Sequence, residues 1–263
     1  MARTTEMKVT PELAREWLAL DHPNRPVRPW KVDQITSDIS LGLWEMNGES
    51  VKHCGEHGGL LDGKHRALGV VRADRPILSV VVFGLPCRTQ HTMDIGSARS
   101  PGNAFALEGA PRANLVAAAT RIIWRIENDL EAETGPKSAP TRRQLLATWE
   151  RHPSIAQSIV WGDRLRSIHL SEATSVAAHY WLNGIDSDTA ERYFGRLADG
   201  VGLVKGSPEL AVRRWLATSA ASRGRAVSAA RLSVVIDGWN SLRLGQPRDI
   251  VRYRADRPFP KAV

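Results

Sequence analysis

The segment LLDGKHRALGVV, residues 60–71, joins a short apolar run to a helical pattern through an Asp-Gly turn. Gly63 allows backbone conformations that side chains disfavour, and a helix that begins there exposes the N–H groups of its first turn. Those groups attract anions, yet Lys64, His65 and Arg66 bring basic side chains to the same place. A bound phosphate would remove that conflict, so the junction predicts a phosphate-contacting turn between a strand and a helix. The alternative is a plain Asp-Gly turn before an exposed basic helix.

The sequence on either side of this junction predicts a small α+β unit. Short strand-like pieces precede it, and ILSVVVFGL, residues 77–85, is β-branched and almost wholly apolar, as in a buried strand. Thr10 before Pro11 marks the start of an earlier helix. Farther along the chain, amphipathic segments that end at Gly or Pro follow one another. We therefore predict an α+β chain with a sheet-and-helix domain over residues 1–100 and a mainly α-helical domain over residues 101–263.

Composition places the chain among ordinary globular proteins. It has 263 residues, of which 42% are hydrophobic and 24% charged, and this is enough to bury a core. No apolar run approaches the roughly 18–20 residues of a membrane helix. The first ten residues lack the apolar core of a secretory signal. We expect no membrane partner and a cytoplasmic location.

The two cysteines, Cys54 and Cys87, provide no disulfide framework, which agrees with a reducing cytoplasm. Cys54 lies between His53 and His57 in the stretch KHCGEHGG, and all three are residue types that bind zinc. Their spacing matches no closed set of four ligands and is typical of a hairpin turn. The sequence therefore predicts neither a disulfide nor a zinc site.

The positive charge of the chain is concentrated near its C-terminal end. Residues 205–263 hold 12 Lys or Arg against 4 Asp or Glu, which accounts for the whole formal net charge of +8. Such a surface attracts nucleic acid, although basic surfaces also serve solubility. We predict DNA as a partner, with phosphate contacts from Arg223, Arg225, Arg231, Arg243, Arg248, Arg252 and Arg254.

Several motifs give the chain a resemblance to a known superfamily. Residues 58–86 resemble the DGQHR-type segment of the ParB/sulfiredoxin-like superfamily, most closely that of the ParB-like proteins of actinobacterial phages and prophages. As in that group, Asn-Gly-Glu precedes the segment at residues 47–49, and a D-x-G-x-x-R motif follows the next strand at residues 94–99. A Trp-Asn helix, a basic stretch and a Phe-Pro complete the pattern over residues 237–260.

The resemblance implies a fold in which the strand–turn–helix unit holds the phosphates of a nucleoside triphosphate, ATP or CTP, with Mg²⁺. The implied nucleotide site comprises Asp62, Gly63, Lys64, His65, Arg66 and Arg99. Asp62 would orient the loop or help to bind the metal. Lys64 stands where sulfiredoxins carry their catalytic Cys, so repair of a sulfinic acid is not expected. The Arg-rich box and the second nucleotide motif of partition-type ParB proteins are missing from the sequence, which argues against CTP switching.

Three functions are compatible with these features. The first is a nucleotide-binding, DNA-associated regulator or DNA-processing factor of phage or prophage origin. The second is an ATP-dependent phosphotransferase or a nuclease, with Glu49 and Asp94 as catalytic residues and with Asp62 and Asp94 as Mg²⁺ ligands. The third is a helical interaction protein whose nucleotide site is vestigial. A homodimer is compatible with each, and the expected location is the cytoplasm of a bacterium or of a phage-infected host.

Overall fold

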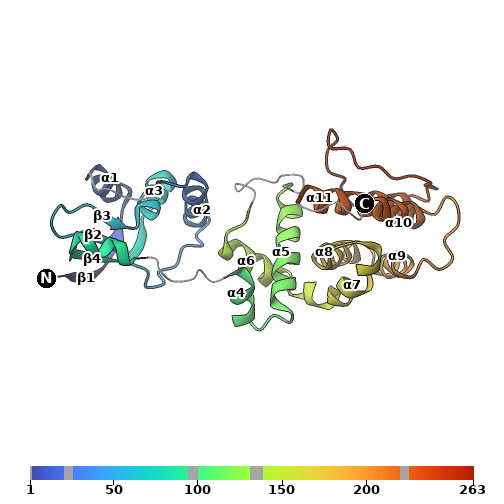
Figure 1. Cartoon of the computed structure of the whole chain (residues 1–263), viewed down its shortest axis with the longest axis horizontal. Helices are drawn as coiled ribbons and strands as arrows, with labels where there is room; N and C mark the ends of the chain where they lie inside the picture. The colour runs from blue at the N-terminus through green and yellow to red at the C-terminus, as the bar shows by residue number, and fades with distance from the viewer. Residues whose placement is uncertain (1, 21–25, 94–99, 131–138, 220–224) are drawn as a thin grey trace. The chain divides into compact units, whose positions relative to one another are not determined.

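The computed structural model describes residues 2–20, 26–93, 100–130, 139–219 and 225–263. The chain is of the α+β class and divides into two compact units, Met1–Ala98 and Arg99–Val263. Figure 1 shows the elements of both units, and each unit is described by itself.

The N-terminal unit is a four-stranded mixed sheet with helices packed against it. Its elements are β1 (Arg3–Val9), α1 (Pro11–Ala19), α2 (Pro29–Ser40), β2 (Val51–Cys54), β3 (Leu60–Asp62), α3 (Lys64–Ala73), β4 (Ile77–Leu85) and the 3-10 helix η1 (Cys87–Thr92). The strand order is β1-β4-β2-β3. The β2–β4 pair is parallel, whereas β1 pairs antiparallel with β4 and β3 pairs antiparallel with β2.

One apolar core joins this sheet to α1, α2 and α3. Val51 and Val81 are fully buried on neighbouring strands, and Trp17 of α1 and Val70 of α3 pack against them. The helix α3 approaches α2 closely at Gly69, where a Cβ atom would lie 2.4 Å from Ile35 Cγ2. The close approach of the two helices therefore depends on the missing side chain at that position.

The strand β1 is an element that the sequence analysis did not predict. Its stretch RTTEMKV carries only two apolar residues, and most of its side chains are exposed. It becomes a strand because its backbone pairs with β4 from Val9↔Ile77 to Arg3↔Phe83. A strand at the edge of a sheet can be largely exposed, so its sequence need not show the apolar, β-branched pattern of a buried strand. The predicted short strands before α3 are confirmed as β2 and β3, and the predicted strand at residues 77–85 is confirmed as β4.

All the regular elements in the described part of the second unit are helices. Its elements are α4 (Pro101–Leu107), α5 (Ala113–Glu127), α6 (Arg142–Arg151), η3 (Pro153–Ser158), α7 (Ile159–Arg164), η4 (Arg166–Ile168), α8 (Glu172–Asn183), α9 (Ser187–Asp199), α10 (Pro208–Thr218) and α11 (Arg225–Arg243). The helix α8 is central, since residues 174–179 are all buried. No helix in the described part of either unit has the length and apolar character needed to cross a bilayer.

The chain after α11 runs back along that helix without forming a helix or a strand. The indole of Trp239, which is fully buried, donates a hydrogen bond to the Val263 carbonyl at 2.9 Å. Arg248 N donates to the Gly206 carbonyl at 2.8 Å, which ties the start of the segment to the α9–α10 connection. Along this segment Val251 is buried, whereas Arg252 is exposed.

The expectation of two unpaired cysteines is wrong in this structure. Cys54 and Cys87 form a disulfide with a Cα–Cα distance of 5.1 Å. The reason is topological: the parallel pairing of β2 with β4 aligns Cys54 with Leu85, two residues before Cys87. A sequence separation of 33 residues carries no hint of that alignment.

Candidate functional site

The predicted phosphate turn forms the junction between β3 and α3. Gly63 is the N-cap of α3 and has a left-handed backbone with φ of 96°. A Cβ atom at this position would lie 3.0 Å from both methyl groups of Val51, so glycine is required by conformation and by space. The N–H groups of the first turn of α3 have no partner within the helix, as at any helix start.

A network of charged groups holds this junction together. One oxygen of Asp62 accepts the Gly63 N–H at 2.7 Å, and the other lies 3.0 Å from Lys52 Nζ and 3.4 Å from Arg66 Nη2. Burial alone would raise the pKa of the Asp62 carboxyl, but the hydrogen bond from Lys52 and the charge of Arg66 lower it below its ordinary value. Asp62 is therefore ionised and balanced by two cations.

Arg66 ties the start of α3 to the loop before β2. Its guanidinium donates to the carbonyls of Glu49 at 2.7 Å and Ser50 at 2.9 Å, besides its contact with Asp62. The side chain is only 13% exposed. Arg66 consequently holds protein groups in this structure, and the predicted contact of its guanidinium with phosphate would require part of this network to open.

The other residues of the predicted nucleotide site are in different situations. His65 is buried, and its Nε2 accepts the Arg28 N–H at 3.0 Å. Lys64 is half-buried and its ammonium makes no hydrogen bond or ion pair with the described residues. Glu49 is exposed in a turn where its N–H donates to Asn47 Oδ1 at 3.1 Å. The predicted residues Asp94 and Arg99 lie outside the described part of the chain.

We expect Arg66→Ala to destabilise the N-terminal unit by about 2–3 kcal/mol, because two charge-assisted hydrogen bonds and an ion pair are lost. Urea titration combined with hydrogen exchange of residues 51–71 measures this locally. Arg72→Ala is the matched control, since Arg72 is 60% exposed in its ion pair with Asp33 and its loss should cost less than about 1 kcal/mol. An Arg66→Ala chain as stable as this control would show that the network contributes nothing.

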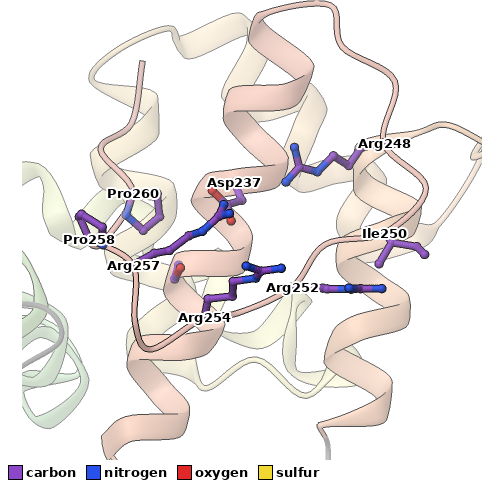
Figure 2. Close-up of a pocket in the computed structure, with 9 residues that line it drawn as sticks. Asp237, Arg248, Ile250, Arg252, Arg254, Arg257, Pro258 and Pro260 are labelled. Carbon is purple, nitrogen blue, oxygen red and sulfur yellow. The ribbon is translucent and has the colours of Figure 1, made fainter.

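The C-terminal unit contains a pocket of about 260 Å³ that is rich in arginine. It lies between α11 and the segment that runs back along it, and Figure 2 shows the side chains that surround it. The lining residues are Ser233, Asp237, Arg248, Ile250, Arg252, Arg254, Arg257, Pro258 and Pro260. Three of the four arginines are in the predicted nucleic-acid set, and the structure brings them to one place. Arg257 was not in the predicted set, although it belongs to the same basic stretch.

The guanidinium groups of the pocket arginines are not bonded to other described side chains or carbonyls. None of the four guanidinium groups makes a hydrogen bond or an ion pair with a residue in the described ranges. Arg252, Arg254 and Arg257 are exposed, and Arg248 is half-buried. Four guanidinium groups with their donors free form a surface that favours oxyanions, phosphate above all.

Asp237 is the one carboxylate among the lining residues. It lies on α11, and Figure 2 shows Arg248 and Arg257 approaching it from opposite sides. Burial raises the pKa of its carboxyl above the ordinary value, although the charges of Arg248 and Arg257 oppose this effect. The Asp237 carboxylate makes no hydrogen bond or ion pair within the described part of the chain, so its charge limits the affinity of the pocket for anions.

The remaining arginines of the predicted nucleic-acid set do not share this environment. Arg231 donates to the Ser219 carbonyl at 2.9 Å, and Arg243 forms an ion pair with Asp186. Arg223 lies outside the described residues, and the side chain of Arg225 is likewise not described. The predicted set of seven arginines therefore contains three pocket residues and two that bind protein groups.

The helical unit also holds a Ser–His–Glu chain of hydrogen bonds. Ser158 Oγ lies 2.9 Å from His179 Nδ1, and His179 Nε2 lies 3.0 Å from Glu191 Oε1. Burial lowers the pKa of His179, and the charge of Glu191, which raises this pKa, offsets only part of the effect. Ser158 is only 3% exposed, whereas the Glu191 side chain is 56% exposed. A nucleophile must reach its substrate, so this arrangement cross-links η3, α8 and α9 rather than forming a triad open to substrate.

Comparison of the chain with protein-family models, with curated proteins and with solved structures finds no match.

We expect Asp237→Asn to raise the stability of the C-terminal unit at neutral pH. A carboxyl whose pKa is raised in the folded state contributes stability at low pH and loses that contribution as the pH rises through the folded pKa. The stability difference between the variant and the original chain should therefore grow from about pH 4 upward. Urea unfolding at a series of pH values measures it, and a difference that is independent of pH would contradict the assignment.

Proposed function

We propose that this protein binds nucleic acid through the arginine pocket of its C-terminal unit, with duplex DNA as the expected partner. The observation that carries the proposal is that Arg248, Arg252, Arg254 and Arg257 lie on one surface, where their guanidinium groups make no hydrogen bond or ion pair with the described residues. Arginine without a protein partner is available for phosphate, which it binds through paired N–H groups. The concentration of the net charge in residues 205–263 supports the same partner.

The arrangement of these arginines favours a polymer over a small anion. Arg252 and Arg254 are both exposed on either side of the half-buried Tyr253, so they lie on the same face, and residues two apart in extended backbone are separated by about 6.5 Å. Arg252 and Arg254 therefore extend a row along the segment, whereas a site for a single small anion converges on one point. The row is held in place because the segment is hydrogen-bonded to the α9–α10 connection at its start and to Trp239 of α11 at its end. A fixed row of cations matches a phosphate backbone at little cost in side-chain and loop ordering.

Replacement of Arg248, Arg252 and Arg254 by Ala is expected to weaken DNA binding and its dependence on salt. Each lost phosphate contact removes about 0.9 from the slope of log K against log salt, so the slope should fall by about 2–3. Fluorescence anisotropy with a labelled duplex at several KCl concentrations measures both quantities. Unlabelled single-stranded DNA and RNA as competitors identify the preferred polymer.

The matched control removes the same charge elsewhere in the unit. Arg121, Arg142 and Arg192 lie on α5, α6 and α9, are exposed, and do not line the pocket. Their combined replacement by Ala should leave the salt slope within about 1 of the original. If the control variant loses as much affinity as the pocket variant, or if the original chain does not bind DNA at low salt, the proposal is wrong.

A second candidate function, nucleotide binding at the start of α3, is favoured by one observation. Lys64 lies in the first turn of the helix, where the positive end of the helix dipole favours anions, and its ammonium has no ion pair with the described residues. This candidate keeps the nucleotide and Mg²⁺ expectations of the family resemblance. It assigns phosphate contact first to Lys64 and to the backbone after Gly63, since Arg66 is engaged with the protein.

Lys64→Ala should then weaken binding of ATP or CTP by about tenfold, or roughly 1.4 kcal/mol. Isothermal titration with each nucleotide, with and without Mg²⁺, measures the affinity. Lys31→Ala is the control because Lys31 is an exposed lysine on α2 of the same unit. Equal affinity of the two variants, or no binding of either nucleotide by the original chain, would rule out this site. Release of inorganic phosphate in the same samples tests the enzyme alternative.

A further inference from the structure

We infer that reduction of the Cys54–Cys87 disulfide creates a binding site for a thiophilic divalent cation, of which Zn²⁺ is the example, with Glu56 as the third ligand. The ligand atoms are already together, because the two Sγ atoms and a carboxylate oxygen of Glu56 all lie within 4.8 Å of one another. In a tetrahedral site with bonds of about 2.0–2.3 Å, ligand atoms are roughly 3.5–4 Å apart. After reduction the two Sγ atoms must move apart to this spacing, which rotation of both cysteine side chains can provide, because their Cα atoms are 5.1 Å apart.

The backbone around these residues supports the ligands. Glu56 N donates to Cys54 Sγ at 3.3 Å, and such a hydrogen bond stabilises a thiolate. Cys87 N donates to Glu56 Oε1 at 3.3 Å, which directs the carboxylate towards the second cysteine. The turn is held against β4 at Gly55, where a Cβ atom would lie 2.9 Å from Gly84 Cα. Sheet pairing therefore places the three ligands independently of the disulfide.

The donor set and its exposure identify the class of metal. Two thiolates and one carboxylate suit Zn²⁺, which accepts sulfur and oxygen ligands alike, whereas Cu(I) prefers soft donors only. Cys54 is 2% exposed, Cys87 is half-buried and Glu56 is exposed. The site therefore opens to solvent on the side of Glu56, where a water molecule can complete four-coordination. His53 is excluded as a ligand at Nδ1, which lies 2.8 Å from the Gly58 carbonyl.

Reduction and metal binding are two separate steps, and the atoms and electrons balance in each. A dithiol reductant gives two electrons and two protons to the disulfide, so the S–S bond breaks, two cysteine thiols form and the reductant becomes a disulfide. Zn²⁺ then displaces the two thiol protons and bonds to both sulfur atoms. The oxidised chain lacks the thiolates and cannot form the site. The two covalent states therefore differ in metal affinity.

The test is a titration of the full chain with Co²⁺ and Zn²⁺ in the reduced and oxidised states. The reduced chain should bind one Co²⁺ with the thiolate charge-transfer band near 300–350 nm, and Zn²⁺ should displace it. The oxidised chain should show no such band. Glu56→Gln, an exposed substitution that leaves both cysteines in place, should weaken binding by at least about tenfold. Glu16→Gln, an exposed change on α1, should have no effect.

Three results would overturn the inference. The first is a reduced chain, shown by circular dichroism to be folded, that gives no charge-transfer band with Co²⁺. The second is a Glu56→Gln chain that binds Zn²⁺ as tightly as the Glu16→Gln control. The third is loss of the N-terminal fold on reduction, since the ligands would then no longer be held together. Cys87→Ser, which removes one thiolate, should abolish the band in a folded chain.

Discussion

The parallel pairing of β2 with β4 determines the layout of the N-terminal unit. Parallel neighbours cannot be joined by a tight turn, so the chain between them must cross over, and here it does so through β3 and α3. The two ends of β2 then acquire different roles. At its start, Arg66 of α3 binds the carbonyls of Glu49 and Ser50. At its end, Cys54 is aligned with the residues that lead to Cys87.

The C-terminal unit depends on a different constraint, the return of the chain along α11. Trp239 is fully buried and binds the carbonyl of Val263, while Asn240 Nδ2 binds that of Lys261 at 2.8 Å. These contacts hold the backbone of the segment, and the guanidinium groups of its pocket arginines make no hydrogen bond or ion pair within the described part of the chain. Their mutual repulsion is reduced by exposure to water and by Asp237. The unit therefore presents positive charge on a rigid surface.

The arginines of the chain show why charge counts do not identify sites. Arg66, Arg231 and Arg243 are basic residues in charged stretches, yet each is engaged with protein groups. Arg248 and Arg252 come from an equally basic stretch and have no such partners among the described residues. The difference lies in which carbonyls and carboxylates the fold brings near each guanidinium. Local sequence gives no information on those distant neighbours.

The sequence by itself determined the α+β class, the buried strand at residues 77–85 and the turn at Gly63. Each of these follows from local chemistry: β-branched apolar residues favour a strand, and a left-handed position favours glycine. It also indicated the basic C-terminal end. Only the tertiary structure decided that Cys54 meets Cys87, that Arg66 binds the loop before β2, and that Asp237 lies among four arginines. Each of these contacts joins residues that are far apart in the chain. Sheet pairing and helix packing bring such residues together, whereas local conformational preferences act only on neighbouring residues.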